Sequence, residues 1–234
     1  ELIIKDPNIL DLFDEKRHEG QNDSYICRLI RTDSIEAFVS YVNRSNTPLT
    51  SEIKPSIFET NLFLIENNAT FIEYAAFFGS IQIFHYLRLN NVELKPSLWL
   101  YAIHSRNAEL IHFLESCKVD PPSLEYYVCF IESIKCHHND VADYIKENLM
   151  SDRYDREEVL SAILQYHNYN YFPDNFVGIY DFFYLSFYKY NSLSKLSLKN
   201  TSNLNDIQNL YCSLLQRKEI ISECFKGYQN LEKI

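Results

Sequence analysis

Glycine is scarce in this chain, which has 4 glycines among 234 residues, whereas an average usage of about 7% would give roughly 16. This shortage excludes glycine-rich phosphate-binding loops and disfavours β-rich folds whose tight turns require glycine. No apolar run approaches the ~18 residues that a membrane-spanning helix needs. We therefore expect an all-α protein with short connections, little or no β structure and no membrane association.

Cysteine pairs and long basic runs are also missing. The six cysteines are scattered without a C-x-x-C pair, which indicates reduced, mostly buried thiols and a cytoplasmic protein. Residues 1–180 carry 15 basic and 27 acidic side chains and residues 181–234 carry 7 and 5, so the net charge of -10 originates in the first part. Because an acidic surface repels nucleic-acid phosphates, we expect no nucleic-acid partner.

What the chain does contain is an internal repeat. Apolar residues recur at spacings of three and four, which is typical of helices. Residues 71–93 align without a gap on residues 98–120, at an offset of 27, and this alignment pairs Ala75 with Ala102. Small residues at such positions let two helices approach closely, which favours stacked helical hairpins over unrelated helices of a globular bundle.

Weaker copies extend this repeat in both directions. A third unit begins near Ser123, and its second helix covers the apolar residues between Val141 and Ile145. Residues 33–38 resemble residues 79–84, and residues 212–225 form a further possible copy. Each unit is a helical hairpin that cannot bury its apolar face alone, so stacked neighbours should share one continuous core.

Several helix starts carry N-cap chemistry, in which a side-chain oxygen accepts a hydrogen bond from a free helical N–H. They are the capping boxes Ser56–Glu59 and Thr70–Glu73, and the hydroxyls of Ser97 and Ser123, which follow prolines. We expect a helix to begin at each of these positions.

The residues from Thr70 to Leu94 resemble an ankyrin repeat. The resemblance rests on a threonine cap, paired alanines, a glycine turn and an apolar pair before leucine, which are Thr70, Ala75-Ala76, Gly79, Ile83-Phe84 and Leu87. More specifically, EYAAFFGSIQIFHYLRLNNVELKPSLWLYAIH, NAELIHFLE and SIKCHHNDVADYI are similar to a divergent ankyrin-like repeat family of unknown function, expanded in parabasalid protists. The resemblance is close across about residues 24–150 and looser across 176–200, and it implies an ankyrin-like solenoid with an interaction role.

The repeat departs from ordinary ankyrin repeats in its length, which is 27 rather than about 33 residues. Only Lys95-Pro96 separates Leu94 from the next cap, so a projecting β-hairpin finger has little room. We expect an N-terminal helical cap with a degenerate repeat over residues 1–66, a repeat core over 67–150, and divergent helical repeats continuous with it over 151–234. Pro173-Asp174 marks the expected break before the last stack.

No catalytic motif is present in the sequence: there is no GxSxG, HExxH, Walker glycine loop or GxGxxG, and we expect no enzyme activity and no cofactor. Cys136-His137-His138 is the densest group of possible metal ligands. A zinc site would need Cys129, or His104 and His112, to complete it. Adjacent helical residues diverge by about 100°, so we interpret the group as a helix end rather than a metal site.

The end of the first helix of each unit is the candidate interaction site, because in ankyrin-type repeats these positions face the concave surface. We expect a concave, non-catalytic protein-binding surface to contain Phe77, Phe78, Asn90, His104, Ser105, Lys135 and Cys136. Exposed phenylalanines there would anchor a protein partner on a monomeric scaffold; alternatively, at least one packs under a preceding helix at residues 56–66. A second possibility is a structural or regulatory module contacting other domains of a longer chain, which the start at Glu1 favours. A metal-binding module is a more distant alternative.

Overall fold

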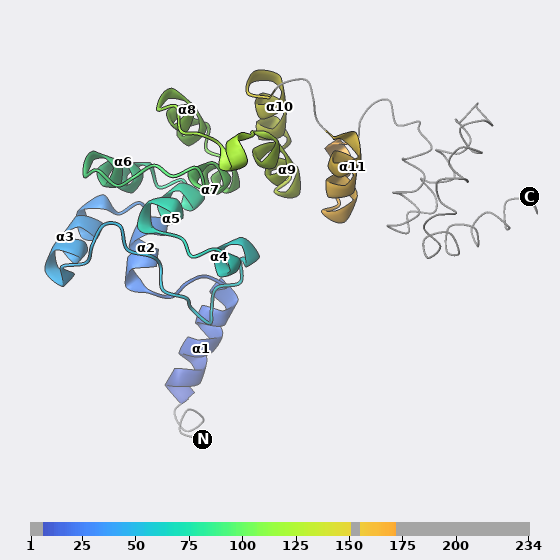
Figure 1. Cartoon of the computed structure of the whole chain (residues 1–234). Helices are drawn as coiled ribbons and strands as arrows, with labels where there is room; N and C mark the ends of the chain where they lie inside the picture. Colours follow the sequence, from blue (N-terminus) through green and yellow to red (C-terminus); the bar gives the residue numbers. More distant parts are fainter. Residues whose placement is uncertain (1–6, 151–154, 172–234) are drawn as a thin grey trace, which may run out of the picture. The chain divides into compact units, whose positions relative to one another are not determined.

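The computed structural model describes residues 7–150 and 155–171. Backbone contacts divide the chain into two units, Glu1–Cys129 and Phe130–Ile234, with the boundary inside one helix. The described residues are helical and contain no strand, and their one isolated β-bridge joins Glu52 to Thr70 (Figure 1). None of the described helices combines the length and apolar character that crossing a membrane requires. The expected all-α class is thus confirmed for these residues.

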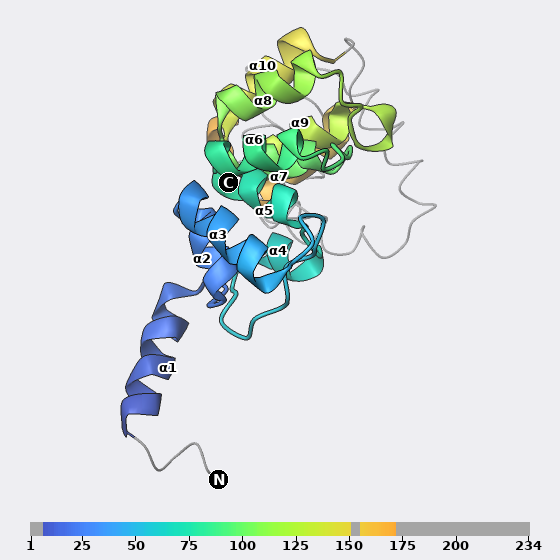
Figure 2. The ribbon, with the colours of Figure 1, turned by 90° about the vertical axis from the view of Figure 1, so that its left-hand side faces the viewer.

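The first unit is built mainly from three helical hairpins, which follow one another from blue to green in Figures 1 and 2. They are α2 (Tyr25–Arg31) with α3 (Ile35–Ser45), α5 (Phe71–Phe78) with α6 (Ile81–Leu89), and α7 (Leu98–Ser105) with α8 (Ala108–Ser116). α1 (Pro7–Glu19) precedes them, and α4 (Leu62–Glu66) lies in a long connecting segment, residues 47–69, between the first two hairpins. The 3-10 turn Pro122–Leu124 leads into α9 (Tyr127–Lys135).

Successive hairpins pack through their equivalent helices: α2 packs on α5, α5 packs on α7, and α3 packs on α6. The apolar spacing seen in the sequence produces this core, since Ile83, Phe84 and Leu87 of α6 are completely buried. Ala75 and Ala102 are also completely buried, in the two helices α5 and α7 that pack on each other. The sequence repeat therefore corresponds to a stack of hairpins within this unit.

Left-handed residues close the helices of each hairpin at the same places. The first helices end before Asp33, Gly79 and Arg106, with φ of 47°, 68° and 52°. The second helices end before Asn46, Asn91 and Lys118, with φ of 51°, 62° and 53°. Six-to-one hydrogen bonds accompany these turns, as in the bond from Val92 N to Leu87 O (3.1 Å) and from Val119 N to Leu114 O (3.0 Å). Gly79 to Arg106 and Asn91 to Lys118 both span 27 residues, the offset of the sequence alignment.

The second unit contains the end of α9, α10 (Asn139–Asn148), α11 (Arg156–Gln165) and the 3-10 turn Tyr169–Tyr171. His137 and His167 have φ of 60° and 59°, and the bonds His138 N to Ser133 O and Asn168 N to Ile163 O repeat the closure seen in the hairpin helices. α9 and α11 therefore end as the helices of the first unit do. The predicted copy at 212–225, the looser stretch at 176–200 and the break at Pro173-Asp174 lie outside the described residues.

Two expected helix starts are wrong. Ser56 opens a turn in which its hydroxyl accepts from Phe58 N (3.1 Å), and α4 begins later, at Leu62, with Asn61 as its cap. Ser123 lies in a 3-10 turn with φ of 58°, so α9 begins at Tyr127. In both cases the chain forms a short turn at the serine, and the helix starts four or more residues later.

The other two starts are confirmed in position. α5 begins after Thr70, whose N–H donates to the Glu73 carboxylate at 2.8 Å, as the capping box requires. α7 begins after Ser97, but the Ser97 hydroxyl donates to Glu73 Oε1 (2.5 Å) rather than capping its own helix. The domain boundaries predicted at residues 66 and 150 stay predictions.

Candidate interaction site

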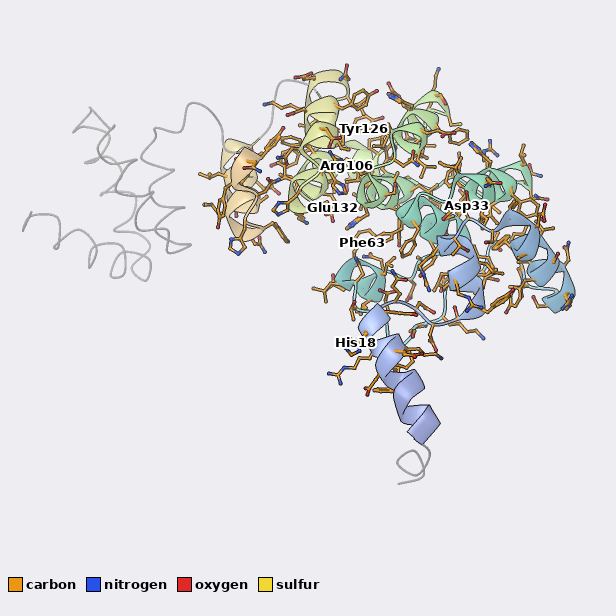
Figure 3. All side chains as sticks on the ribbon, turned by 180° about the vertical axis from the view of Figure 1, so that it is seen from behind. His18, Asp33, Phe63, Arg106, Tyr126 and Glu132 are labelled. Carbon is orange, nitrogen blue, oxygen red and sulfur yellow. The ribbon has the colours of Figure 1, made fainter. Side chains whose placement is uncertain are left out.

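Five aromatic side chains of the first unit form the centre of the candidate site: Phe63 from α4, Phe77 and Phe78 from α5, and Tyr101 and His104 from α7. We call this set the aromatic cluster. The Phe77 ring stacks on His104 with centroids 5.0 Å apart and on Phe63 at 6.0 Å. Phe63 in turn contacts His104 at 4.2 Å and Tyr101 at 4.9 Å. Figure 3 shows the labelled Phe63 between α4 and the hairpins.

The cluster is only partly covered. Phe77, Phe78, Phe63 and His104 are each half-buried, whereas Tyr101 is buried. The expectation that one of these phenylalanines packs under a preceding helix is met by Phe77, which stacks on Phe63 of α4. This helix covers Leu62–Glu66 and is shorter than the expected 56–66. Neither phenylalanine is fully exposed, and neither is fully buried.

Phe78 lies against a cation and a buried phenol. The Arg31 guanidinium lies 5.9 Å from the centre of the Phe78 ring and donates to the Tyr74 hydroxyl at 2.9 Å. Burial, and to a smaller extent the nearby Cys27, raises the pKa of Tyr74 above its usual value. Burial also raises the pKa of the Cys27 thiol. These two groups therefore remain protonated at neutral pH and supply neither a general base nor a nucleophile.

The first part of the connecting segment is tied to the α1–α2 junction by polar bonds. Asn22 is buried, and its side-chain amide donates to the Lys54 carbonyl (2.8 Å) while its N–H donates to Glu59 (3.2 Å). The Thr60 hydroxyl donates to the Gly20 carbonyl at 2.8 Å. Glu59 of the expected capping box is thus used in a contact between segments rather than in a helix start.

α4 itself is held differently. None of its five residues is buried, and its polar groups are satisfied locally, by Asn61 Oδ1 accepting from Leu64 N and Asn67 Nδ2 donating to the Phe63 carbonyl. Leu62 and Ile65 are 70% and 52% exposed. Through the Phe63 ring, α4 contacts Phe77 of α5 and Tyr101 and His104 of α7.

Two further predicted residues of the first unit have local roles. Ser105 Oγ donates to the Ala102 carbonyl (2.7 Å) and accepts from Asn107 N (3.2 Å), so it shapes the turn after α7. Asn90 is exposed at the end of α6, where its amide donates to the Tyr86 carbonyl. Because α5 and α6 form a hairpin, Asn90 lies at the end opposite Phe77 and Phe78. The structure brings together Phe77, Phe78 and His104, but not Asn90.

Lys135 and Cys136 belong to the second unit. Burial lowers the pKa of Lys135, but the Glu132 carboxylate, 3.1 Å from Nζ, outweighs this effect and raises it overall. The same ammonium lies 5.5 Å from the Tyr166 ring centre. Burial, reinforced by Glu132, raises the pKa of Cys136 to about 12, so its thiol is protonated at neutral pH. His137 Nε2 lies 2.7 Å from the Tyr166 carbonyl oxygen.

Sequence reasoning missed Phe63 and Arg31. Arg31 precedes the left-handed Asp33 by two residues, as Phe77 precedes Gly79, so the repeat alignment carries a signal for it. Phe63 lies in a segment with no counterpart in the other hairpins of the unit, and no repeat position identifies it.

Comparison with known proteins gives no match: neither a family model, nor a curated protein, nor a solved structure is similar to this chain. The geometry of the site therefore carries the functional argument. Rings that are half-exposed and fixed by neighbouring helices suit recognition of an apolar or aromatic group.

Proposed function

We propose that the chain is a non-catalytic, cytoplasmic protein-binding scaffold, an ankyrin-like solenoid of the divergent protist family that its sequence resembles. The proposal depends on one observation. Phe77 and His104, which occupy the same position of two successive hairpins, stack on each other and are only half-buried. A repeat that leaves the same position partly open in successive hairpins provides a continuous surface for a protein partner.

The mechanism is burial of apolar anchors inside a polar rim. The rings of the aromatic cluster supply the anchor, and completing their burial removes apolar area from water. The acidic excess over residues 1–180 would steer basic partners toward the surface and speed their association. No covalent step, metal or cofactor enters this function, and the scaffold acts as a monomer.

Affinity purification of the intact chain followed by mass spectrometry tests this function. The double variant Phe77→Ala/Phe78→Ser should lose the partners that the wild type retains. Leu89→Ser is a matched control because Leu89 is 82% exposed on α6 and lies outside the aromatic cluster. Circular dichroism must show that both variants keep the helical fold. A folded double variant that retains every wild-type partner would refute the proposal.

A further inference from the structure

We infer that α4 is a displaceable cover that occupies the docking site, and that the ligand replacing it is a short amphipathic protein segment presenting an aromatic ring in the place of Phe63. This inference rests on the proposed interaction function and adds the chemistry of the partner. It begins from the rings that surround Phe63, which lie at centroid distances of 4.2 Å (His104), 4.9 Å (Tyr101) and 6.0 Å (Phe77).

These contacts define a site for one aromatic ring. Two partners lie on α7 and one lies on α5, so the site is made by two successive hairpins, while the ring that fills it comes from outside the repeat. The edge-on contact with Tyr101 and the stacked contact with Phe77 are arrangements that aromatic pairs favour. The present occupant therefore shows which chemistry the site accepts: a phenylalanine flanked by aliphatic residues, as in Leu62-Phe63-Leu64-Ile65.

The attachment of α4 is weak compared with that of the hairpins. It belongs to none of the extensively packed helix pairs, none of its residues is buried, and its capping bonds are internal. Among the described residues, no hydrogen bond joins α4 to α5 or α7. A pocket also lies beside α4, lined mainly by the connecting segment, including Ile53, Leu64 and Ile65, together with Asn22 and Tyr74. Moving α4 away would therefore cost mainly the contacts of the Phe63 ring and the partial burial of Leu64.

The connecting segment can release α4 without detaching completely. The bonds of Lys54, Glu59 and Thr60 to the α1–α2 junction precede α4. After α4, the bonds Ile53 N to Ala69 O (2.7 Å) and Phe71 N to Ser51 O (3.0 Å) hold the chain at the start of α5. α4 is thus a loop tip between two fixed ends, the kind of element that opens locally without global unfolding.

An internal occupant competes with an external one. The apparent affinity for a ligand is reduced by the fraction of molecules whose site is open. Removing the Phe63 ring should therefore raise the affinity for a ligand that enters the same site, whereas removing a solvent-facing residue of α4 should not.

The test uses a synthetic peptide of residues 57–68, IFETNLFLIENN, labelled with a fluorophore and titrated with the intact chain. The Phe63→Ala chain should bind it at least ~10-fold more tightly than the wild type. Leu62→Ala, a change at the adjacent exposed residue, should bind it as the wild type does. A peptide carrying Phe63→Ala should not bind, and adding Phe77→Ala to the Phe63→Ala chain should abolish binding. Equal affinities of the three chains, or no binding by a folded Phe63→Ala chain, would overturn the inference.

Hydrogen exchange provides a second measurement that needs no variant. The amides of residues 64–67 should exchange at least ~100-fold faster than those in the middle of α5, through local opening. Equal protection would also overturn the inference. Neither the peptide titration nor the hydrogen exchange requires an outside partner. If both fail while Phe77→Ala/Phe78→Ser still loses partners, the displaceable cover is refuted and the scaffold function is kept. If the double variant keeps every partner in the purification experiment, the scaffold function is refuted instead.

Discussion

The stacked hairpins and the connecting segment of residues 47–69 are two parts of one unit that are stabilised in different ways. In the hairpins, side chains such as Phe84, Leu87 and Ile103 are completely buried and every described helix end has a regular closure. In the connecting segment, Ile57, Leu62 and Ile65 are 85%, 70% and 52% exposed. Burial of apolar area stabilises the first part, and polar bonds to the α1–α2 junction hold the second.

Because of this difference, the hairpins supply the stability of the unit, whereas the connecting segment is the part that can move to admit a partner. A surface formed by the hairpins has fixed geometry, because changing it would disturb a shared core. A segment held by two half-buried rings, Phe58 and Phe63, and a few polar bonds can move at small cost. The aromatic cluster lies where the two meet, so a rigid receptor surface and its movable cover occur in one unit.

The division between the two parts would be wrong if replacing a buried hairpin residue cost as little stability as replacing an exposed residue of the connecting segment. Phe84 of α6 is completely buried and packs edge-on against Phe113 with centroids 5.6 Å apart. Phe84→Ala should lower the free energy of unfolding by about 3–5 kcal/mol through lost burial and a cavity. Leu62→Ala in α4 should change it by less than about 0.5 kcal/mol. Urea denaturation of the two variants measures both values, and similar losses would contradict the division.

A second variant tests the link between hairpins. Asp33, after α2, accepts hydrogen bonds from Gln82 N (3.0 Å) and Ile83 N (2.9 Å), and so caps α6 of the next hairpin. Figure 3 shows its label beside these helices. Asp33→Ala should cost about 1–2 kcal/mol, because it removes the cap and places alanine, which tolerates the left-handed region less well than aspartate, at φ of 47°. Asp33→Asn, which keeps an acceptor oxygen and tolerates this backbone, should cost less in the same denaturation assay.

The third prediction concerns the left-handed residues that follow α8 and α6. Lys118 follows the end of α8 at φ of 53°, and Asn91 follows the end of α6 at φ of 62°. Lys118→Gly should stabilise the chain by about 0.5–1 kcal/mol, since glycine adopts this conformation without strain. Asn91→Gly should gain less, because asparagine already tolerates it. Thermal unfolding gives the order of the two, and a destabilised Lys118→Gly would show that this turn is not strained.

The hairpins could be predicted from the sequence because the same physical demand recurs at a fixed interval. Apolar residues at helical spacing, the Thr70–Glu73 box and the 27-residue offset each follow from local chemistry. The low glycine content gains a structural meaning here, since Asp33, Asn91, Arg106 and Lys118 adopt left-handed turns that glycine would fill more easily.

The candidate site could be predicted only in part. The repeat position pointed to Phe77, Phe78 and His104, which do lie together. The place of Phe63 depends on how a non-repeating segment folds back, and that is decided by bonds between distant residues, such as Asn22 with Lys54 and Thr60 with Gly20. Ser56 and Glu59 have the spacing of a capping box, yet long-range partners use them differently, since Ser56 donates to Asp23. Local patterns carry no signal for such choices.

The smallest effect concerns the polar attachment of the connecting segment. Bonds from Lys16 and then Ser56 lower the pKa of Asp23 below its ordinary value of 3.8, against a small opposing effect of burial. A carboxyl whose pKa is lowered on folding stabilises the fold above its unfolded pKa, and this contribution is lost as the pH falls through the folded pKa. Because the Lys16–Asp23 pair is solvent-accessible, we expect only a few tenths of a kcal/mol, further reduced by salt. Asp23→Asn should therefore be slightly less stable than the wild type at pH 6, and the difference should shrink as the pH falls below about 3.8 and vanish below the lowered pKa of Asp23 in the folded chain. A difference that persists unchanged at low pH would show that Asp23 holds the connecting segment through its shape and hydrogen bonds rather than through its charge.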